Sequence, residues 1–482
     1  MSTPKEPEQI VIDRRPIWIV IFDYMRRGIL LALLFGLFLF FLGREGPADL
    51  SKEAYKTLCL FFFCVSLWTT NLIPLSITSL FAIAMIPLLG IMEASKAYAY
   101  FCNQAVFFIL GVFILSAAMI GCGLSARISI WVLEHWGQSP RSLVTSIYFF
   151  GAFGSCLMSE HAVAAMLFPI VMEIALALKL KKQESPLAKS LFFALAWGCI
   201  IGGATTVLGG GRAPLGMEIL RKSTDGANVL TILQYTQLSL PLILLMLACG
   251  WVLLLLLFPP EITDILPARE VLHRKFQALG KVRFQEKGIA AVMIITLVCW
   301  FTFGEAGMAN IAILSIVALF VFNLTNWKMM DEHVNWAVIL MYGGAICLGE
   351  VMANTGAALW LAKQVFGGAV YSTPIFLITV AFAGWVLTTF VNDSAAVAML
   401  LPPVLSMSQA YGINPTMAAM IVILSSNFAF ILPIGTPASA LAYSSRFITL
   451  KDMIRSGMLL GFLGILCCIF LLLIYWPLIG VK

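Results

Sequence analysis

The stretch His161-Ala-Val-Ala-Ala-Met-Leu-Phe-Pro169 decides the fold, because the chain repeats it as Ser394-Ala-Ala-Val-Ala-Met-Leu-Leu-Pro402. Each copy belongs to a polar interruption in a long apolar segment, Ser159-Glu160-His161 in the first and Asn392-Asp393-Ser394 in the second. A weaker match follows in the same order and at a similar distance, Gly210-Gly211-Arg212-Ala213-Pro214 against Gly435-Thr436-Pro437-Ala438-Ser439. Self-similarity at a shared spacing predicts two related halves in one chain.

The composition places these halves in a membrane. Of the 482 residues, 61% are hydrophobic and 11% are charged, against roughly 25% charged in an ordinary soluble domain. The mean hydropathy is +0.97. These values exclude a soluble enzyme, a nucleic-acid-binding protein and a disordered scaffold. The 11 cysteines are scattered through apolar runs without metal-ligand spacing. We therefore expect buried thiols and no cofactor apart from sodium ions.

The sequence predicts an all-α polytopic membrane protein, because a bilayer core needs about 20 apolar residues per helix. Eleven transmembrane spans are predicted, near residues 28–43, 55–72, 74–92, 104–121, 189–207, 230–258, 288–304, 308–326, 335–353, 416–432 and 454–478. Residues 142–181 and 373–411, each cut by a polar triplet, are predicted to be re-entrant helical hairpins. Residues 189–220 and 416–449 are predicted to be broken helices, because Gly and Pro stand where each helix should continue. Irregular backbone at membrane depth must be shielded by protein or line a cavity.

Lysine and arginine predict the orientation. The N-terminal segment 1–27, the 178–190 loop and the 259–287 loop are basic and fall on one face, which the positive-inside rule makes cytoplasmic. The protein is expected in the cell membrane or inner membrane, with its N-terminus in the cytoplasm and its C-terminus on the outer side. Residues 267–282 form either an amphipathic helix on the membrane or a solvated loop.

The two hairpins are separated by five predicted spans. Because this number is odd, they should enter the membrane from opposite faces, which divides the chain into a first half (28–258) and a second half (288–482). Inverted repeats with discontinuous helices that meet at the midplane are a recurrent plan of secondary transporters.

Further motifs resemble the divalent anion–sodium symporter family of the ion transporter superfamily, over nearly the whole chain. Leu67-Trp68-Thr69-Thr70-Asn71-Leu72-Ile73-Pro74 resembles the second span of that family. Asp331-Glu332-His333-Val334-Asn335-Trp336, followed by Leu340-Met341-Tyr342-Gly343-Gly344-Ala345, resembles its ninth, and Pro433-Ile434-Gly435-Thr436-Pro437 resembles its second helix break. The resemblance implies an elevator-type carrier of di- and tricarboxylates or sulfate, commonly a homodimer, with a scaffold and a mobile transport part.

In that family two Ser-Asn-Thr triplets cap the hairpin tips, bind substrate carboxylates and help to hold sodium. Here both triplets place an acid where the family has Asn. The matching positions predict a substrate site made of Ser159, Glu160, His161, Arg212, Asn392, Asp393, Ser394, Thr436 and Pro437. The resemblance also implies ion or proton coupling, with sodium as the metal ion, at Ser155, Ser159, Glu160, Gly209, Gly210, Thr388, Asn392, Asp393 and Gly435. Ser155 and Ser159 are four residues apart, as are Thr388 and Asn392, so each pair shares one helix face.

Three roles remain open for Glu160 and Asp393, since a charged side chain inside a span is costly and faces a cavity or a partner. Their oxygens suit a hard cation such as Na⁺. Burial also favours the uncharged form of a carboxyl group, which suits a proton site. The third role is a structural pair with a nearby cation. Arg212 either neutralises Glu160 in place of sodium or binds a substrate carboxylate with two N–H groups. His161 is a candidate proton acceptor.

The sequence thus predicts a secondary active transporter, and not an enzyme, for small organic anions, with dicarboxylates first. Alternating access would be coupled to protons or anion exchange, or to sodium. The rivals within the superfamily are a cation/proton antiporter and a sulfate-type carrier. An intramembrane enzyme that uses Glu160 and His161 lacks a nucleophile or metal partner, and the inverted hairpins disfavour a channel. The expected partners are the anion, the lipid bilayer and a second copy of the chain, with no nucleic acid.

Overall fold

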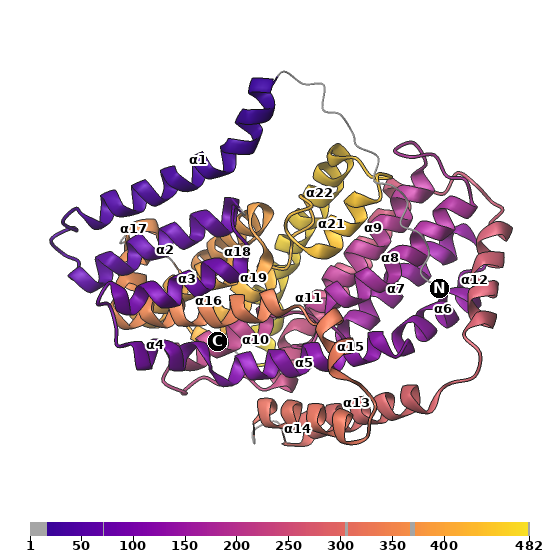
Figure 1. Cartoon of the computed structure of the whole chain (residues 1–482). Helices are drawn as coiled ribbons and strands as arrows, with labels where there is room; N and C mark the ends of the chain where they lie inside the picture. The colour runs from indigo at the N-terminus through magenta and orange to yellow at the C-terminus, as the bar shows by residue number, and fades with distance from the viewer. Residues whose placement is uncertain (1–16, 71, 304–306, 367–371, 481–482) are drawn as a thin grey trace.

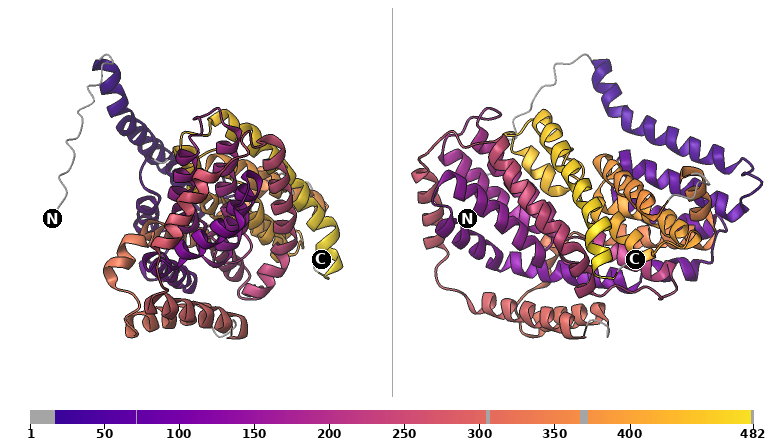
Figure 2. Two further views of the ribbon diagram at one scale, coloured as in Figure 1. Left: turned by 90° about the vertical axis from the view of Figure 1, so that its right-hand side faces the viewer. Right: turned by 180° about the vertical axis from the view of Figure 1, so that it is seen from behind.

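The computed structural model describes residues 17–70, 72–303, 307–366 and 372–480, and every regular element in these ranges is helical (Figure 1). Asn71 of the second-span motif and residues 1–16 of the predicted N-terminal segment lie outside the described residues. Most helices pack into one body, whereas α1 (Ile17–Leu42) runs along one edge of it. The pair α13 (Phe284–Phe303) and α14 (Met308–Val321) lies along the opposite edge, as the two further views also show (Figure 2).

Eight helical stretches of the described residues are long and apolar enough to cross a membrane. They are Met25–Leu42, Ala94–Gly121, Glu160–Ala177, Pro186–Gly203, Ile232–Leu257, Trp336–Asn354, Thr373–Phe390 and Leu450–Leu478. The predicted spans 55–72 and 288–304 coincide with helices that are not among the eight, so the count of eleven is not confirmed. Two of the eight, Glu160–Ala177 and Thr373–Phe390, are arms of the predicted hairpins. Length alone therefore does not separate an arm from a span.

The first half of the chain begins with helices that precede the repeat. After α1 come α2 (Lys52–Thr70), α3 (Leu75–Leu88), α4 (Ala94–Phe101), α5 (Gln104–Gly121) and α6 (Leu124–Trp136). Asn103 starts α5 because its side-chain oxygen accepts the N–H groups of Ala105 and Val106. The polar turn before α5 is therefore satisfied by its own side chain.

The elements that carry the repeat are α7 (Pro140–Leu157), α8 (Glu160–Ala177), α9 (Pro186–Gly203) and α10 (Arg212–Ser223) in the first half. Their counterparts are α18 (Thr373–Phe390), α19 (Asp393–Ala410), α20 (Pro415–Ser425) and α21 (Pro437–Ser444). Each set consists of two helices joined at a tip, followed by two helices separated by a non-helical break. The polar triplets lie at the tips, and the Gly- and Pro-rich motifs lie at the breaks.

The two tips have the same backbone conformation. Met158 has φ −137° and ψ 164°, and Val391 has φ −129° and ψ 157°. The next residues also agree, since Ser159 has φ −55° and ψ 131°, and Asn392 has φ −58° and ψ 142°. Two extended residues thus interrupt each helix pair, and each new helix starts at an acid.

Glycines allow the helices around the first tip to approach closely. A Cβ atom at Gly198 of α9 would lie 2.3 Å from the carbonyl oxygen of Tyr148, and one at Gly202 would lie 2.2 Å from that of Ala152. Both carbonyls belong to α7, so the contact is with backbone and cannot relax by side-chain rotation. The close packing of α7 on α9 therefore positions the tip at the end of α7 beside the break at the end of α9.

The remaining helices complete the body. They are α11 (Ile232–Leu257), α12 (Leu266–Ala278), α15 (Trp327–His333), α16 (Trp336–Asn354), α17 (Ala357–Phe366), α22 (Leu450–Phe470), the π-helical turn η2 (Leu471–Tyr475) and α23 (Trp476–Leu478). Of residues 267–282, the structure has 267–278 in the helix α12. It is tied to α8 by Lys275 Nζ, 2.9 Å from Glu173 Oε1, and to α6 by His273 Nδ1, 2.7 Å from Glu134 Oε1.

Candidate functional site

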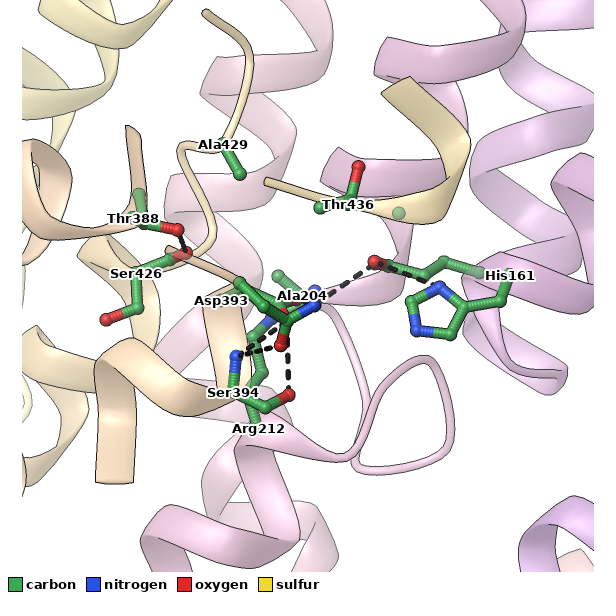
Figure 3. A network of polar contacts seen from close by, with 12 residues as sticks. His161, Ala204, Arg212, Thr388, Asp393, Ser394, Ser426, Ala429 and Thr436 are labelled. Carbon is green, nitrogen blue, oxygen red and sulfur yellow. Dashed lines mark hydrogen bonds and ion pairs between the residues drawn. The ribbon is translucent and has the colours of Figure 1, made fainter. Parts of the chain in front are cut away.

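Arg212 joins the tips of the two halves. It is the first residue of α10, directly after the first break, and it is 1% exposed. Its Nη1 donates to Glu160 Oε2 at 3.1 Å and to Asp393 Oδ2 at 2.6 Å. The acids are 0% and 2% exposed, so all three groups lie out of water. Figure 3 shows Arg212 beside Asp393 and Ser394. One guanidinium nitrogen is thus shared by the first acidic residues of α8 and α19.

The two acids differ in their other partners. Asp393 Oδ1 accepts the backbone N–H of Ser394 at 2.6 Å and its hydroxyl at 3.1 Å. The Ser394 hydroxyl lies 2.9 Å from the Tyr342 hydroxyl of α16. Glu160 Oε1, in contrast, has no hydrogen-bond partner among the described residues. His161 Nδ1, also on α8, lies 3.6 Å from it.

The far edge of the Arg212 guanidinium is also free. Nε and Nη2 are buried and make no hydrogen bond within the part of the chain that the structure describes. In two other arginines of the chain the same Nε–Nη2 edge binds a carboxylate. Arg127 uses Nε and Nη2 to bind both oxygens of Glu286, at 2.6 and 3.2 Å, and Arg221 binds both oxygens of Glu218 in the same way, at 2.9 and 2.7 Å. The edge of Arg212 therefore has the geometry of a two-pronged carboxylate site.

The breaks hold the tips by backbone hydrogen bonds. Glu160 N–H donates to Gly209 O at 2.8 Å, and Asp393 N–H donates to Gly435 O at 3.4 Å. Gly203 leaves room for the first acid, because a Cβ atom there would lie 2.5 Å from Glu160 Oε2. The same pattern in both halves places each acid at the start of its helix, where the dipole favours negative charge.

A profile of the family described as "Sodium:sulfate symporter transmembrane region" matches residues 25–481. The chain belongs to this family. It is an integral membrane transporter and not an enzyme, and the predicted resemblance is confirmed. The sodium-dependent dicarboxylate transporter SdcS of Staphylococcus aureus (strain bovine RF122 / ET3-1) is 24% identical over 478 residues, which cover 93% of this chain and 91% of that protein.

Two solved transporters of this architecture are similar in fold. The YdaH transporter of Alcanivorax borkumensis has a TM-score of 0.51 at 14% identity and covers 96% of this chain and 99% of its own. MtrF of Neisseria gonorrhoeae, one of a class described as antimetabolite efflux pumps, has a TM-score of 0.56 at 12% identity, with 92% and 96% covered. At this identity they show the fold alone.

Within this symporter fold, the residues predicted for ion coupling divide by their hydrogen bonds. Ser155 is 0% exposed, and its hydroxyl has no partner among the described residues. Thr388 instead donates to Ser426 O at 2.8 Å, and Asn392 Oδ1 accepts the Ser394 N–H at 3.1 Å. Gly209 and Gly435 supply the carbonyls that hold the tips. Ser426, at the start of the second break, also has a buried hydroxyl without a partner among the described residues, so both halves present one.

The other predicted substrate residues lie around the bridge. Thr436 is 1% exposed, and its hydroxyl oxygen accepts the Ser439 N–H at 3.2 Å, which starts α21 at Pro437. Ser159 precedes Glu160 at the tip and makes no side-chain cap with α8. Gly210 lies beside the guanidinium, since a Cβ atom there would be 2.9 Å from Arg212 Nη1.

Two tyrosines at the site were not predicted. Tyr342 contacts Ser394, and Tyr235 of α11 donates to Ala204 O of the first break at 3.0 Å. Tyr342 stands in the Leu340–Ala345 motif, so a signal was present, but the motif does not show which helix face meets the site. Tyr235 had no signal in the sequence.

Proposed function

We propose that this protein is a secondary active transporter of small organic anions, dicarboxylates first, and that Arg212 binds a substrate carboxylate. The observation that carries the proposal is the buried Nε–Nη2 edge of Arg212. Two donors on a planar group fit the two oxygens of a carboxylate, and unmet buried donors cost free energy. SdcS, named as a sodium-dependent dicarboxylate transporter, supports the substrate class.

The charges at the site favour proton coupling. With both acids ionised, Glu160, Asp393 and Arg212 carry one excess negative charge, which repels an incoming anion. A proton on one acid removes this excess, and it also weakens that acid's hold on the guanidinium. Substrate and proton binding then support one another, which is the requirement for co-transport.

Anion exchange and sodium coupling remain as alternatives with their own support. Anion exchange would result if the transport part can return across the membrane only while Arg212 holds an anion. Sodium is favoured by the free Ser155 hydroxyl beside Gly209 and by the name of SdcS. It is disfavoured by the guanidinium next to Glu160, because Arg212 already supplies the positive charge that sodium would bring.

The proposed cycle is alternating access by an elevator movement. The transport part would comprise α7–α10 and α18–α21, including the two tips. The tips would belong to two re-entrant hairpins of an inverted repeat, in a protein with eleven spans. The remaining helices would form the scaffold, and two copies would assemble in the cell or inner membrane. The N-terminus would be cytoplasmic and the C-terminus outside.

Uptake of labelled succinate into proteoliposomes tests the proposal. A proton gradient, a sodium gradient and internal unlabelled dicarboxylate are imposed in turn. We expect uptake driven by protons or by internal anion. Arg212→Lys keeps the charge but loses the planar edge, and it should lower uptake about tenfold or more.

The matched control is Arg221→Lys on the same helix, since the edge of Arg221 is already occupied by Glu218. It should leave uptake unchanged. Equal uptake by Arg212→Lys and the wild type would refute the proposed binding role. Transport of labelled sulfate without succinate would indicate the sulfate-type carrier, and sodium–proton exchange without anion transport would indicate the cation antiporter.

A further inference from the structure

We propose that an organic anion reaches Arg212 through a passage between α5, α10 and α11, which an apolar gate closes in this structure. The gate consists of Phe108, Val207 and Pro214. This inference rests on the proposed function, because it assigns the route by which a substrate carboxylate reaches the guanidinium. It goes beyond that function by naming residues outside the polar triplets that decide when the site is open.

The passage starts in a cavity of about 320 Å³, here called the mouth cavity, which lies where α5, α11 and α14 begin and α10 ends. Its wall includes the exposed side chains of Gln104 and Gln234. Gln234 Oε1 accepts the Thr231 N–H at 2.9 Å, which leaves the amide N–H groups of Gln234 as uncharged donors. Such donors hold an anion more weakly than a guanidinium does. An anion met here is therefore free to move on.

The charged residues of the mouth cavity do not hold the anion either. Among the described residues that line it, the charged ones are Glu218 and Arg221. They bind each other through both carboxylate oxygens, at 2.9 and 2.7 Å. Because this pair occupies the Nε–Nη2 edge of Arg221, the matching edge of Arg212 is the stronger carboxylate site.

A smaller hollow continues from the mouth cavity toward the first break. Both are lined by Phe108, Val207 and Pro214, and the smaller one is also lined by Gly210. A Cβ atom at Gly210 would lie 2.9 Å from Arg212 Nη1, so this inner hollow ends beside the guanidinium. Its volume of about 10 Å³ is that of about one water molecule. A dicarboxylate such as succinate does not fit into it.

The three shared residues therefore form a closed gate. Phe108 is 3% exposed and Val207 is 2% exposed, and Pro214 is buried as well. Phe108 belongs to α5 and packs edge-on against Trp300 of α13, with 5.4 Å between the ring centroids. Val207 and Pro214 belong to the first break and to α10. In the proposed cycle the gate thus lies between the scaffold and the transport part, and movement of one past the other would open it.

A cysteine behind the gate tests the route. Leu208 lines the inner hollow but not the mouth cavity, and it is 3% exposed. The purified Leu208→Cys protein is treated with 2-sulfonatoethyl methanethiosulfonate, a small anionic thiol reagent, and the mass of the intact protein follows the reaction. The wild-type protein, with its own 11 cysteines, gives the baseline.

We expect slow reaction of Leu208→Cys, because only the open form admits the reagent and a minor state is populated to about 0.1–10%. Added Phe108→Ala removes the ring from the gate, so the reaction should become faster by about tenfold or more. The matched control is Phe107→Ala, since Phe107 is the next residue of α5 and is 42% exposed. It should leave the rate unchanged.

The mouth cavity has a matched pair of its own on α11. Gln234→Trp adds a large ring to the wall of this cavity and should slow the reaction in the Leu208→Cys, Phe108→Ala background. Gln237→Trp changes the same residue type three positions further along, outside the wall of either cavity, and should not. If Leu208→Cys does not fold, Val207→Cys supplies a reporter closer in size to the native residue.

Transport supplies an independent readout. Phe108→Trp enlarges the ring in the gate and should lower the maximal rate of succinate exchange in proteoliposomes several-fold, whereas Phe107→Trp should keep it. Equal reaction rates with and without Phe108→Ala would show that this ring does not close the passage. Equal rates with Gln234→Trp and Gln237→Trp would place the approach to Arg212 elsewhere. Failure of the proposed function would be distinct, because the wild type would then show no succinate exchange, while the reaction rates would still report whether the two cavities form one passage.

Discussion

Removal of the shared cation should destabilise the protein more than any other single change at the site. Arg212→Met keeps a long unbranched side chain but deletes the guanidinium. Glu160 and Asp393, which are 0% and 2% exposed, then lose their common partner. Breaking a buried ion pair by removing one member costs about 3–5 kcal/mol. Because one nitrogen serves both acids here, we expect the upper end of that range.

The assay is the apparent unfolding temperature of the purified protein in detergent, at one fixed scan rate because unfolding of such a protein is a kinetic event. Arg212→Met should unfold well below the wild type. Arg221→Met, whose side chain is 39% exposed, should cost no more than about 1 kcal/mol. The triple variant Glu160→Gln, Arg212→Met, Asp393→Asn should recover most of the loss, since no unpaired charge remains buried.

The sign of the pH dependence gives a second check. In Arg212→Met the two carboxylates face each other without a cation, so protonation relieves both the repulsion and the desolvation. The stability gap to the wild type should therefore narrow on acidification and widen at alkaline pH. If Arg212→Met had the same apparent unfolding temperature as the wild type at alkaline pH, this would refute the view that this cation holds the two tips together.

Three further changes test the packing that positions the site. Gly211→Ala would put a Cβ atom 1.8 Å from the Tyr342 hydroxyl, so we expect about 1–3 kcal/mol lower stability and impaired succinate exchange, whereas Gly36→Ala, with nothing within 4 Å, should change neither. Gly202→Ala would put a Cβ atom 2.2 Å from the Ala152 carbonyl oxygen, so α9 would have to move away from α7. This change should lower the yield of monodisperse protein in size-exclusion chromatography. Arg127→Gln removes hydrogen bonds to Gly280 O at 2.8 Å and to Leu279 O at 2.9 Å, so trypsin should cut faster at Lys281 and Arg283. Glu93→Gln, which breaks an exposed pair at 4.0 Å without removing a trypsin site, should leave the rate of cutting there unchanged.

The positions of the helix breaks could be predicted from the sequence because they depend on local chemistry. The polar triplets and the Gly–Pro motifs coincide with the ends of α7, α9, α18 and α20. The extent of a helix beyond its apolar part was not predicted. The first span was placed at 28–43, and the stretch of α1 that could cross a membrane is Met25–Leu42, but the helix itself begins at Ile17. Charged residues such as Arg26 and Arg27 mark where apolar surroundings end, and they do not end a helix, because arginine is a good helix former.

The candidate site, too, could be predicted only where it depends on local sequence motifs. Proximity of Glu160 to Arg212 was expected from the family resemblance, which places the first break beside the first hairpin tip, and the structure places Arg212 Nη1 3.1 Å from Glu160 Oε2. That Asp393 shares the same nitrogen depends on how the two halves pack, which no local pattern contains. The unequal hydrogen bonding of the two acids depends further on Tyr342, contributed by a helix outside the repeat.

A shared guanidinium makes the two halves of the repeat depend on each other. Each tip is anchored to its own break through a backbone bond, from Glu160 to Gly209 and from Asp393 to Gly435, so each half can position its acid alone. Among the residues that the structure describes, Arg212 alone connects the two acids, at 3.1 and 2.6 Å. In the proposed function, an anion bound at the Nε–Nη2 edge would share the charge of the guanidinium with both carboxylates, and protonation of an acid would favour the anion. Coupling between charge and substrate would then follow from this one side chain, without a separate signal between the halves.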